Sequence, residues 1–118
     1  MHIIVKNKDT LLYDEFKFKC SVGKKGITSK KIEGDKKTPK GIYALGPLYF
    51  RKDRLSEPLT KLKKIQIKKS LGWCDDINSK FYNKPIKTNK KTRHEKLFRK
   101  NNNYDLLIPI KYNTKRPT

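Results

Sequence analysis

The chain has 118 residues and carries a formal net charge of +20 at neutral pH, from 31 lysines and arginines against 11 aspartates and glutamates. Leucine, isoleucine, valine and phenylalanine contribute 29 of the residues, about a quarter, which excludes a composition typical of disorder. A chain of this length has room for one modest core, so we expect a single domain over residues 1–118. Self-repulsion among the lysines should make that fold marginal.

The positive charge has two interpretations. A strongly basic chain is typical of proteins that meet nucleic acid or another anionic surface. However, 26 of the 31 basic residues are lysine, whereas base readout and bidentate phosphate contacts favour arginine. A surplus of lysine, asparagine and isoleucine can also reflect a gene rich in A and T. Charge alone therefore leaves both a polyanion surface and a compositional bias open.

Apolar stretches and cysteines are few. No stretch approaches the roughly 20 apolar residues of a membrane helix, so we expect no membrane span. The run Ile3–Val5 is far shorter than a signal-peptide core of about 7 to 15 residues, so no secretory leader is expected in this chain. Cys20 and Cys74 form neither a disulfide framework nor a close-spaced metal motif. We therefore expect no metal and no cofactor.

The first part of the chain reads as strands and turns. His2–Lys6 is predicted to be a short strand, followed by a turn at Asn7–Thr10. Apolar and polar residues alternate over Phe16–Val22, which predicts a half-buried strand with one wet face. Cys20 falls on the apolar face and is expected to be a small core residue. A turn is expected at Gly23–Gly26, before a polar loop.

A threonine-proline turn follows that loop. Pro39 fixes φ and favours an extended Thr38, while Gly34 and Gly41 bracket the turn. From Gly41 the chain is apolar and aromatic through Phe50, which predicts a largely buried strand. Gly46-Pro47 interrupts it and indicates an edge position or a bulge.

The second half contains short strands and one helix candidate. Leu62–Ile67 is predicted to be a strand with one solvated face, whereas Trp73 stands in a loop-like context. Thr92 and Glu95 have capping-box spacing, which predicts a short helix over Thr92–Arg99. Tyr104–Tyr112 is nearly continuous in apolar residues and predicts a strand buried on both faces. Together these elements favour a mainly β domain.

The threonine-proline turn belongs to a longer series of motifs. Gly34-Asp35-x-x-Thr38-Pro39-x-Gly41-x-Tyr43 resembles the G-x-x-x-T-P-x-G-x-[FY] element of L,D-transpeptidase catalytic domains, the YkuD family. The resemblance implies a β-sandwich or mixed sheet with one short helix. Further segments are similar to that family in the same order: Gly26-Ile27 with Lys31 and Glu33, Leu48–Arg54, Gly72–Asp76 with Tyr82-Asn83, Glu95–Arg99, and Tyr104–Leu107 with Tyr112-Asn113.

The resemblance implies an acyltransferase of cell-wall assembly. In the family a cysteine thiolate attacks a peptide stem of peptidoglycan, D-alanine leaves, and an amine from a second stem resolves the thioester into a cross-link. That cysteine lies in a Ser/Thr-x-Gly-Cys turn after a histidine-bearing strand, and the 118 residues contain no such turn. We therefore expect the N-terminal two-thirds of the domain, truncated at the C-terminus, with no catalytic residue of its own. The family acts in the periplasm or cell wall.

Four residues are candidates for substrate binding. By their positions in the resemblance, Trp73, Asp75, Asp76 and Tyr82 flank the groove for the peptide stem. The residues alone leave alternatives open. Trp73 is either a core anchor or a groove wall. The two aspartates are either turn formers or lysine partners, or a pair of metal ligands.

Cys74 and His94 invite comparison with a cysteine-histidine site. A nucleophilic thiol needs a neighbour that lowers its pKa. Asp75 and Asp76 beside Cys74 disfavour the thiolate. We therefore expect a structural or substrate-flanking role for Cys74.

Two other functions remain open. A basic nucleic-acid-binding module would stack bases on Tyr43, Tyr49 and Phe50 beside Arg51 and Arg54. A non-catalytic wall-binding fragment is the third alternative. Without a neighbouring strand, the apolar segment near the C-terminus should also leave an open edge that favours self-association.

Overall fold

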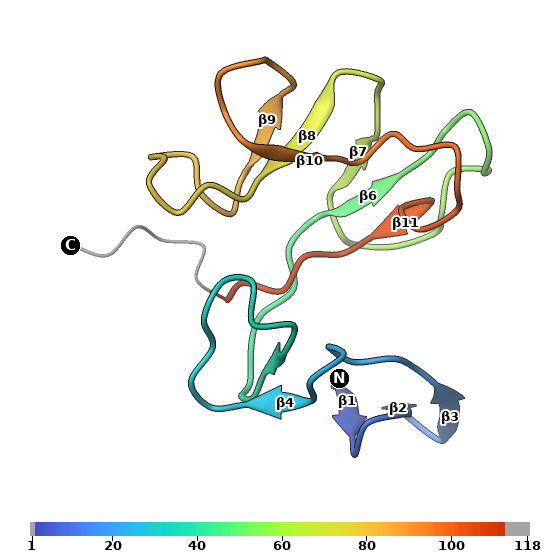
Figure 1. Ribbon diagram of the computed structural model, residues 1–118. Helices are drawn as coiled ribbons and strands as arrows, with labels where there is room; N and C mark the ends of the chain where they lie inside the picture. Colours follow the sequence, from blue (N-terminus) through green and yellow to red (C-terminus); the bar gives the residue numbers. More distant parts are fainter. Residues whose placement is uncertain (1, 113–118) are drawn as a thin grey trace. The chain divides into compact units, whose positions relative to one another are not determined.

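The computed structural model describes residues 2–112 (Figure 1). These residues form short β-strands in four small sheets and contain no helix, so the prediction of a mainly β fold is confirmed. The chain divides into two compact units between Ile42 and Tyr43, and each is described by itself. The strands are β1 (Ile3–Lys6), β2 (Thr10–Tyr13), β3 (Phe16–Lys19), β4 (Ile27–Thr28), β5 (Thr38–Pro39), β6 (Leu48–Phe50), β7 (Lys64–Gln66), β8 (Leu71–Cys74), β9 (Pro85–Lys87), β10 (His94–Lys96) and β11 (Leu106–Leu107).

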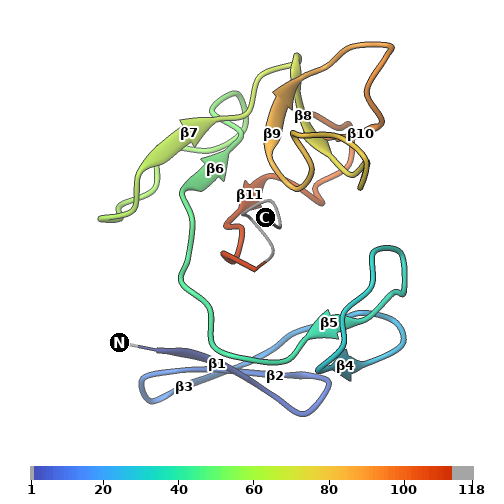
Figure 2. The same ribbon diagram turned by 90° about the vertical axis from the view of Figure 1, so that its left-hand side faces the viewer.

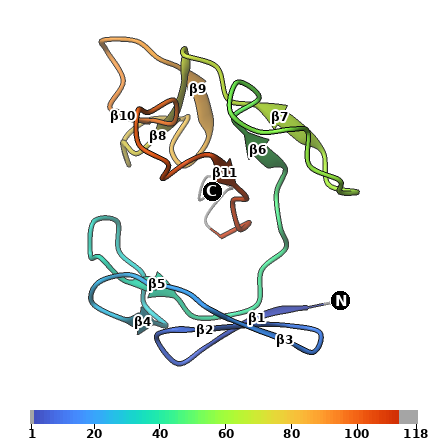
Figure 3. The same cartoon turned by 90° about the vertical axis from the view of Figure 1, so that its right-hand side faces the viewer.

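In the first unit, β1, β2 and β3 form an antiparallel meander (Figure 3). Its register places Tyr13 opposite both Ile3 and Phe16, so the apolar residues that alternate along the strands share one face. The predicted period of two is confirmed. The expected burial is not, because Phe16 and Phe18 remain about half exposed. Cys20 follows β3 and is only partly buried, so its assignment to a core is wrong.

The threonine-proline turn is extended, as predicted. Thr38 and Pro39 form β5, which pairs in parallel with β4. The hydroxyl oxygen of Thr38 accepts a hydrogen bond of 2.6 Å from the main-chain N–H of Gly23. A Cβ atom on Gly23 would lie 2.6 Å from the carbonyl carbon of Lys37. Only glycine therefore allows this close approach.

Asp35 organises the loop before that turn. Its carboxylate accepts hydrogen bonds from the ammonium group of Lys31 at 2.6 Å and from the main-chain N–H groups of Ile32 and Lys37 at 2.9 Å each. The bond from Lys31 is the main reason why the pKa of Asp35 is lowered from 3.8 to about 2. The Asp35 carboxylate thus holds the polar loop closed.

We expect the Asp35 loop to open only in strong acid. Because folding lowers this pKa, the ionised carboxylate stabilises the loop above about pH 3.8, and the contribution is lost as the pH falls towards 2. Amide NMR shifts of Ile32 and Lys37 should titrate with a midpoint near 2, and the variant Asp35→Asn should lack the transition. A midpoint near 3.8 in the unmodified chain would show that Lys31 does not hold this carboxylate.

In the second unit, β6 is the centre of one three-stranded sheet. It pairs with β7 in parallel and with β11 in antiparallel orientation. Tyr49 of β6 forms the core cluster with Ile67 and Leu97. The predicted strand at Leu62–Ile67 is confirmed as β7, with Gln66 exposed and Ile67 buried immediately after it.

The strand expected from Gly41 to Phe50 is shorter than predicted. Leu107 lies opposite Tyr49, and Ile110 lies opposite Leu45. Between these two pairs, three residues of the first strand face two residues of the second. This is a bulge at Gly46-Pro47, as the glycine and proline indicated. The regular strand begins only at Leu48.

A second sheet has the order β10-β8-β9 (Figure 2). Trp73 lies on β8 and not in a loop. The helix predicted over Thr92–Arg99 is wrong, since His94–Lys96 form β10 and pair with β8. Two turns of isolated helix are marginal, and the capping interaction is absent. The Glu95 carboxylate instead accepts hydrogen bonds from Arg99 and from the hydroxyl of Tyr104.

The apolar segment near the C-terminus is an edge and not a buried strand. Only Leu106 and Leu107 form regular β11, with one further bridge at Ile110. Leu106 is 53% exposed, and Ile108 and Ile110 are 39% exposed each, so the expected burial on both faces is wrong. Asn113, part of one motif quoted above, lies outside the described residues. Among the residues described, no helix has the length and apolar character needed to cross a membrane.

Candidate functional site

The four predicted site residues lie on β8 and on the loop that follows it. Trp73 is on the strand, and Asp75, Asp76 and Tyr82 lie in the loop 75–84. Two main-chain hydrogen bonds close this loop at its base, from Cys74 to Lys84 at 3.0 Å and from Asn83 to Cys74 at 2.8 Å. The predicted residues therefore lie in one short segment, the end of β8 and a closed loop.

Trp73 packs inward. Its ring meets the ring of Tyr49 edge to face, with centroids 6.0 Å apart, and it contacts the core cluster. Its indole N–H donates a 3.0 Å hydrogen bond to the side-chain oxygen of Asn83. This is the environment of a core anchor, with the polar group of the indole already bound within the chain.

Asn83 links the loop to the end of the described chain. Its side-chain amide accepts from Trp73 and donates to the carbonyl of Tyr112 at 2.9 Å. Its φ of 58° lies in the left-handed region, which asparagine tolerates better than most residues. In the sequence, the feature that could have predicted this role is an asparagine at the end of a polar loop, directly after Tyr82.

The two aspartates have different partners. Asp75 pairs with the guanidinium of Arg93 at 3.2 Å. Asp76 accepts from the main-chain N–H of Asn78 at 2.9 Å and closes a turn through Ser79. The prediction of a turn former is confirmed for Asp76, and Asp75 pairs with an arginine where a lysine was expected. No group of three potential metal ligands occurs among the described residues.

Cys74 and His94 lie opposite each other on β8 and β10. The Cys74 side chain is fully buried. The Nδ1 atom of His94 is 2.7 Å from the carbonyl oxygen of Thr92. The ring lies over Gly72, where a Cβ atom would be 2.8 Å from its Cδ2 atom. Within the part of the chain that the structure describes, no hydrogen bond joins the thiol to the imidazole, so the arrangement does not supply an activated nucleophile.

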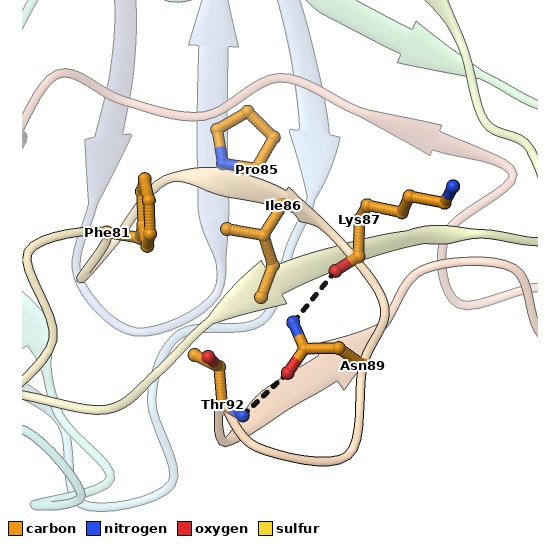
Figure 4. A pocket seen from close by; sticks show the side chains of 6 residues that line it. All are labelled: Phe81, Pro85, Ile86, Lys87, Asn89 and Thr92. Atoms are coloured by element: carbon orange, nitrogen blue, oxygen red, sulfur yellow. Dashed lines mark hydrogen bonds between the residues drawn. The ribbon is translucent and has the colours of Figure 1, made fainter.

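A small hollow of about 260 Å³ lies beside this loop and β9 (Figure 4). Asn89 holds its rim by donating to the carbonyl of Lys87 at 3.1 Å and accepting from the N–H of Thr92 at 2.7 Å. Its volume is below the roughly 300 Å³ typical of small-molecule sites. None of the four predicted residues belongs to its lining, which consists of Phe81, Pro85, Ile86, Lys87, Asn89 and Thr92.

Arg51 is a buried and heavily hydrogen-bonded side chain, a structural role that the sequence did not predict. It is 3% exposed, and its guanidinium donates to both carboxylate oxygens of Asp53 at 2.8 and 2.7 Å. It also donates to the carbonyl of Arg99 at 2.7 Å and lies 3.6 Å from the ring centre of Phe98. The hydrogen bond to Arg51 lowers the pKa of Asp53. This cation joins the end of β6 to the chain after β10.

Arg54 continues the same connection. Its guanidinium donates to the carbonyls of Arg99, Lys100 and Asn101 and to the side chains of Asn102 and Asp105. The segment 99–105 therefore wraps around two arginines, whose donors bind main-chain carbonyls and carboxylates within the chain.

The residues proposed for base stacking are not available as a platform. Tyr49 and Phe50 are buried, and burial raises the pKa of Tyr49. Arg51 and Arg54 are bound as described above. The alternative of a base-stacking surface that includes Tyr49, Phe50 and Arg51 is therefore contradicted, although the charge of the chain is unaffected by this correction.

Comparison with protein-family models, with curated proteins and with solved structures finds no match to this chain.

Proposed function

We propose that this chain is the scaffold of an L,D-transpeptidase-type domain, which holds peptide stems of peptidoglycan and contributes no nucleophile of its own. The observation that carries the proposal is the ordered series of sequence elements from Gly26 to Asn113. The proposal includes the family's β-sandwich or mixed sheet, with sheets β11-β6-β7 and β10-β8-β9 as part of it.

The roles of the motif residues fit a scaffold. Arg51 and Arg54 belong to the motif Leu48–Arg54. They bind the segment 99–105, which connects the motifs Glu95–Arg99 and Tyr104–Leu107. In a further motif, Trp73 donates to the side chain of Asn83, which in turn donates to the carbonyl of Tyr112. These residues hold distant parts of the chain together, so their occurrence in the resemblance has a structural reason. The chemical step would then depend on a cysteine and a histidine that the 118 residues do not present in an activated arrangement.

We expect the 118-residue chain to form no acyl-enzyme. Incubation with a carbapenem, followed by intact-protein mass spectrometry, should show no adduct, because Cys74 is buried without a hydrogen-bonded base. The variants Cys74→Ser and Cys20→Ser identify the sulfur if an adduct forms. Labelling at Cys74 would overturn the view that the chain has no nucleophile.

Stem binding is tested separately by sedimentation with purified peptidoglycan. Retention should survive washing in 0.5 M salt, which screens simple attraction between the lysines and the wall polymer. Asp76→Asn keeps the acceptor that closes the turn but removes the charge, whereas Asp76→Ala removes both. Loss of binding in both variants would assign the carboxylate to the stem, and loss in the alanine variant alone would assign it to the loop. No retention by the unmodified chain would refute the proposal.

A nucleic-acid-binding module is the second candidate, favoured by the charge of residues 43–112. Residues 43–112 contain 18 lysines and arginines and six aspartates and glutamates, a net charge of +12. Five of those six acids are already in ion pairs. A single-stranded oligonucleotide should then bind with an affinity that falls steeply with salt. Binding to DNA but not to peptidoglycan would favour this candidate.

A further inference from the structure

The open edge of β11 differs from the other sheet edges of the second unit. Edge strands in soluble proteins are usually protected from pairing by charges, especially lysine, or by proline. The other three edge strands, β7, β9 and β10, each contain a lysine. From Leu106 to Ile110 there is no charged residue. The one proline in this stretch, Pro109, protects the edge only if its nitrogen faces outward.

The register shows that Pro109 faces inward. Arg51 donates its N–H to the carbonyl of Asp105, and Gly46 donates to that of Pro109. Alternate residues of an antiparallel strand turn their main-chain groups to opposite sides. The groups of Asp105, Leu107 and Pro109 therefore face β6. Those of Leu106, Ile108 and Ile110 face away from it.

Most of the outward main-chain groups of this edge have no hydrogen-bond partner within residues 2–112. Among the described residues, no hydrogen bond reaches the N–H groups of Leu106, Ile108 and Ile110 or the carbonyls of Leu106 and Ile108; the carbonyl of Ile110 accepts from Tyr112. The side chains of these three residues lie on one face of the strand and are exposed. Leu45, opposite Ile110, adds a fourth exposed apolar side chain to that face.

We propose that this edge, Leu106–Ile110, binds an extended acidic peptide segment of another protein as an added β-strand. A row of main-chain donors and acceptors recognises polypeptide backbone, and the exposed side chains select apolar residues at alternate positions. The charge selects the flanks of that segment, because residues 43–112 have a net charge of +12 and five of their six acids are already paired. A second copy of the chain fits this edge less well, since it also carries +20.

The test uses the full chain and a fluorescent peptide, Glu-Glu-Val-Thr-Val-Thr-Val-Glu-Glu, followed by anisotropy. Replacing the four terminal glutamates by lysines should weaken binding at least tenfold. N-methylation of the valines alone and of the threonines alone separates the two edges of the peptide, since only one set of amides faces β11. One set of methyl groups should weaken binding at least tenfold and the other less than threefold.

On the protein side, Ile108→Pro removes an outward N–H and Ile108→Val keeps it. The proline variant should lose binding at least tenfold, and the valine variant should bind within threefold of the unmodified chain. Equal effects of the two methylated peptides, or equal binding of the lysine-ended peptide, would overturn the proposal even if Ile108→Pro does not fold. Concentration-dependent dimerisation that the peptide does not reverse would assign the edge to a second copy and also overturn it.

Discussion

Replacing Arg51 with alanine is expected to lower the melting temperature of the second unit by about 10 °C or more, which corresponds to a severe single substitution in a small domain. Arg51 is almost fully buried and joins β6 to Asp53, Phe98 and the carbonyl of Arg99. Its removal takes both guanidinium donors from the Asp53 carboxylate, leaves the carbonyl of Arg99 with Arg54 as its remaining donor, and opens a cavity over the phenylalanine ring. Trp73, the single tryptophan, lies in this unit, so its fluorescence reports the transition.

Matched variants separate the contacts of Arg51 from its charge. Lys52→Ala removes a neighbouring exposed cation and should change the melting temperature by less than about 2 °C. Arg51→Lys keeps the charge but cannot bind both oxygens of Asp53 in the same planar geometry, so most of the loss should remain. Hydrogen exchange of segment 99–105 should rise in both Arg51 variants. Equal melting of Arg51→Ala and Lys52→Ala would contradict the structural role.

The sequence predicted those strands whose alternation of apolar and polar residues is visible within the strand itself. The alternation around Phe16 and the apolar residues around Ile65 each predicted a strand that the structure contains. The segment around Glu95 was predicted as a helix because capping-box spacing is also local. Its actual partner, β8, is about 20 residues away in sequence, and pairing with it outweighs a weak helical preference.

The candidate site was predictable only in part for the same reason. The predicted residues Trp73 to Tyr82 are close in sequence, so the fold could hardly separate them. Arg51 and Arg54 bind main-chain carbonyls 45 to 48 residues away. Carbonyl groups carry no residue identity, so no spacing of side chains in the sequence could reveal these bonds. The buried arginine was instead assigned to a candidate surface because it follows aromatic residues that could stack bases.

Leu97→Ala is expected to destabilise the second unit by about 2–5 kcal/mol. Leu97 follows β10, is 2% exposed and belongs to the core cluster with Tyr49 and Ile67. Removing its side chain leaves a cavity that strands on two sheets cannot easily fill. Because small domains are stable by only about 5–15 kcal/mol, this loss should lower the urea midpoint followed by Trp73 fluorescence severely or prevent folding.

Leu59 provides the matched control for the same substitution. Its side chain is fully exposed, at 102% of the reference area, so Leu59→Ala should change stability by less than about 0.5 kcal/mol. The pair also tests the strand at His94–Lys96, because that strand places Leu97 against the core. If both leucine variants unfolded at the same urea concentration, Leu97 would not be buried, and the pairing of β10 with β8 would have to be abandoned together with the core that it completes.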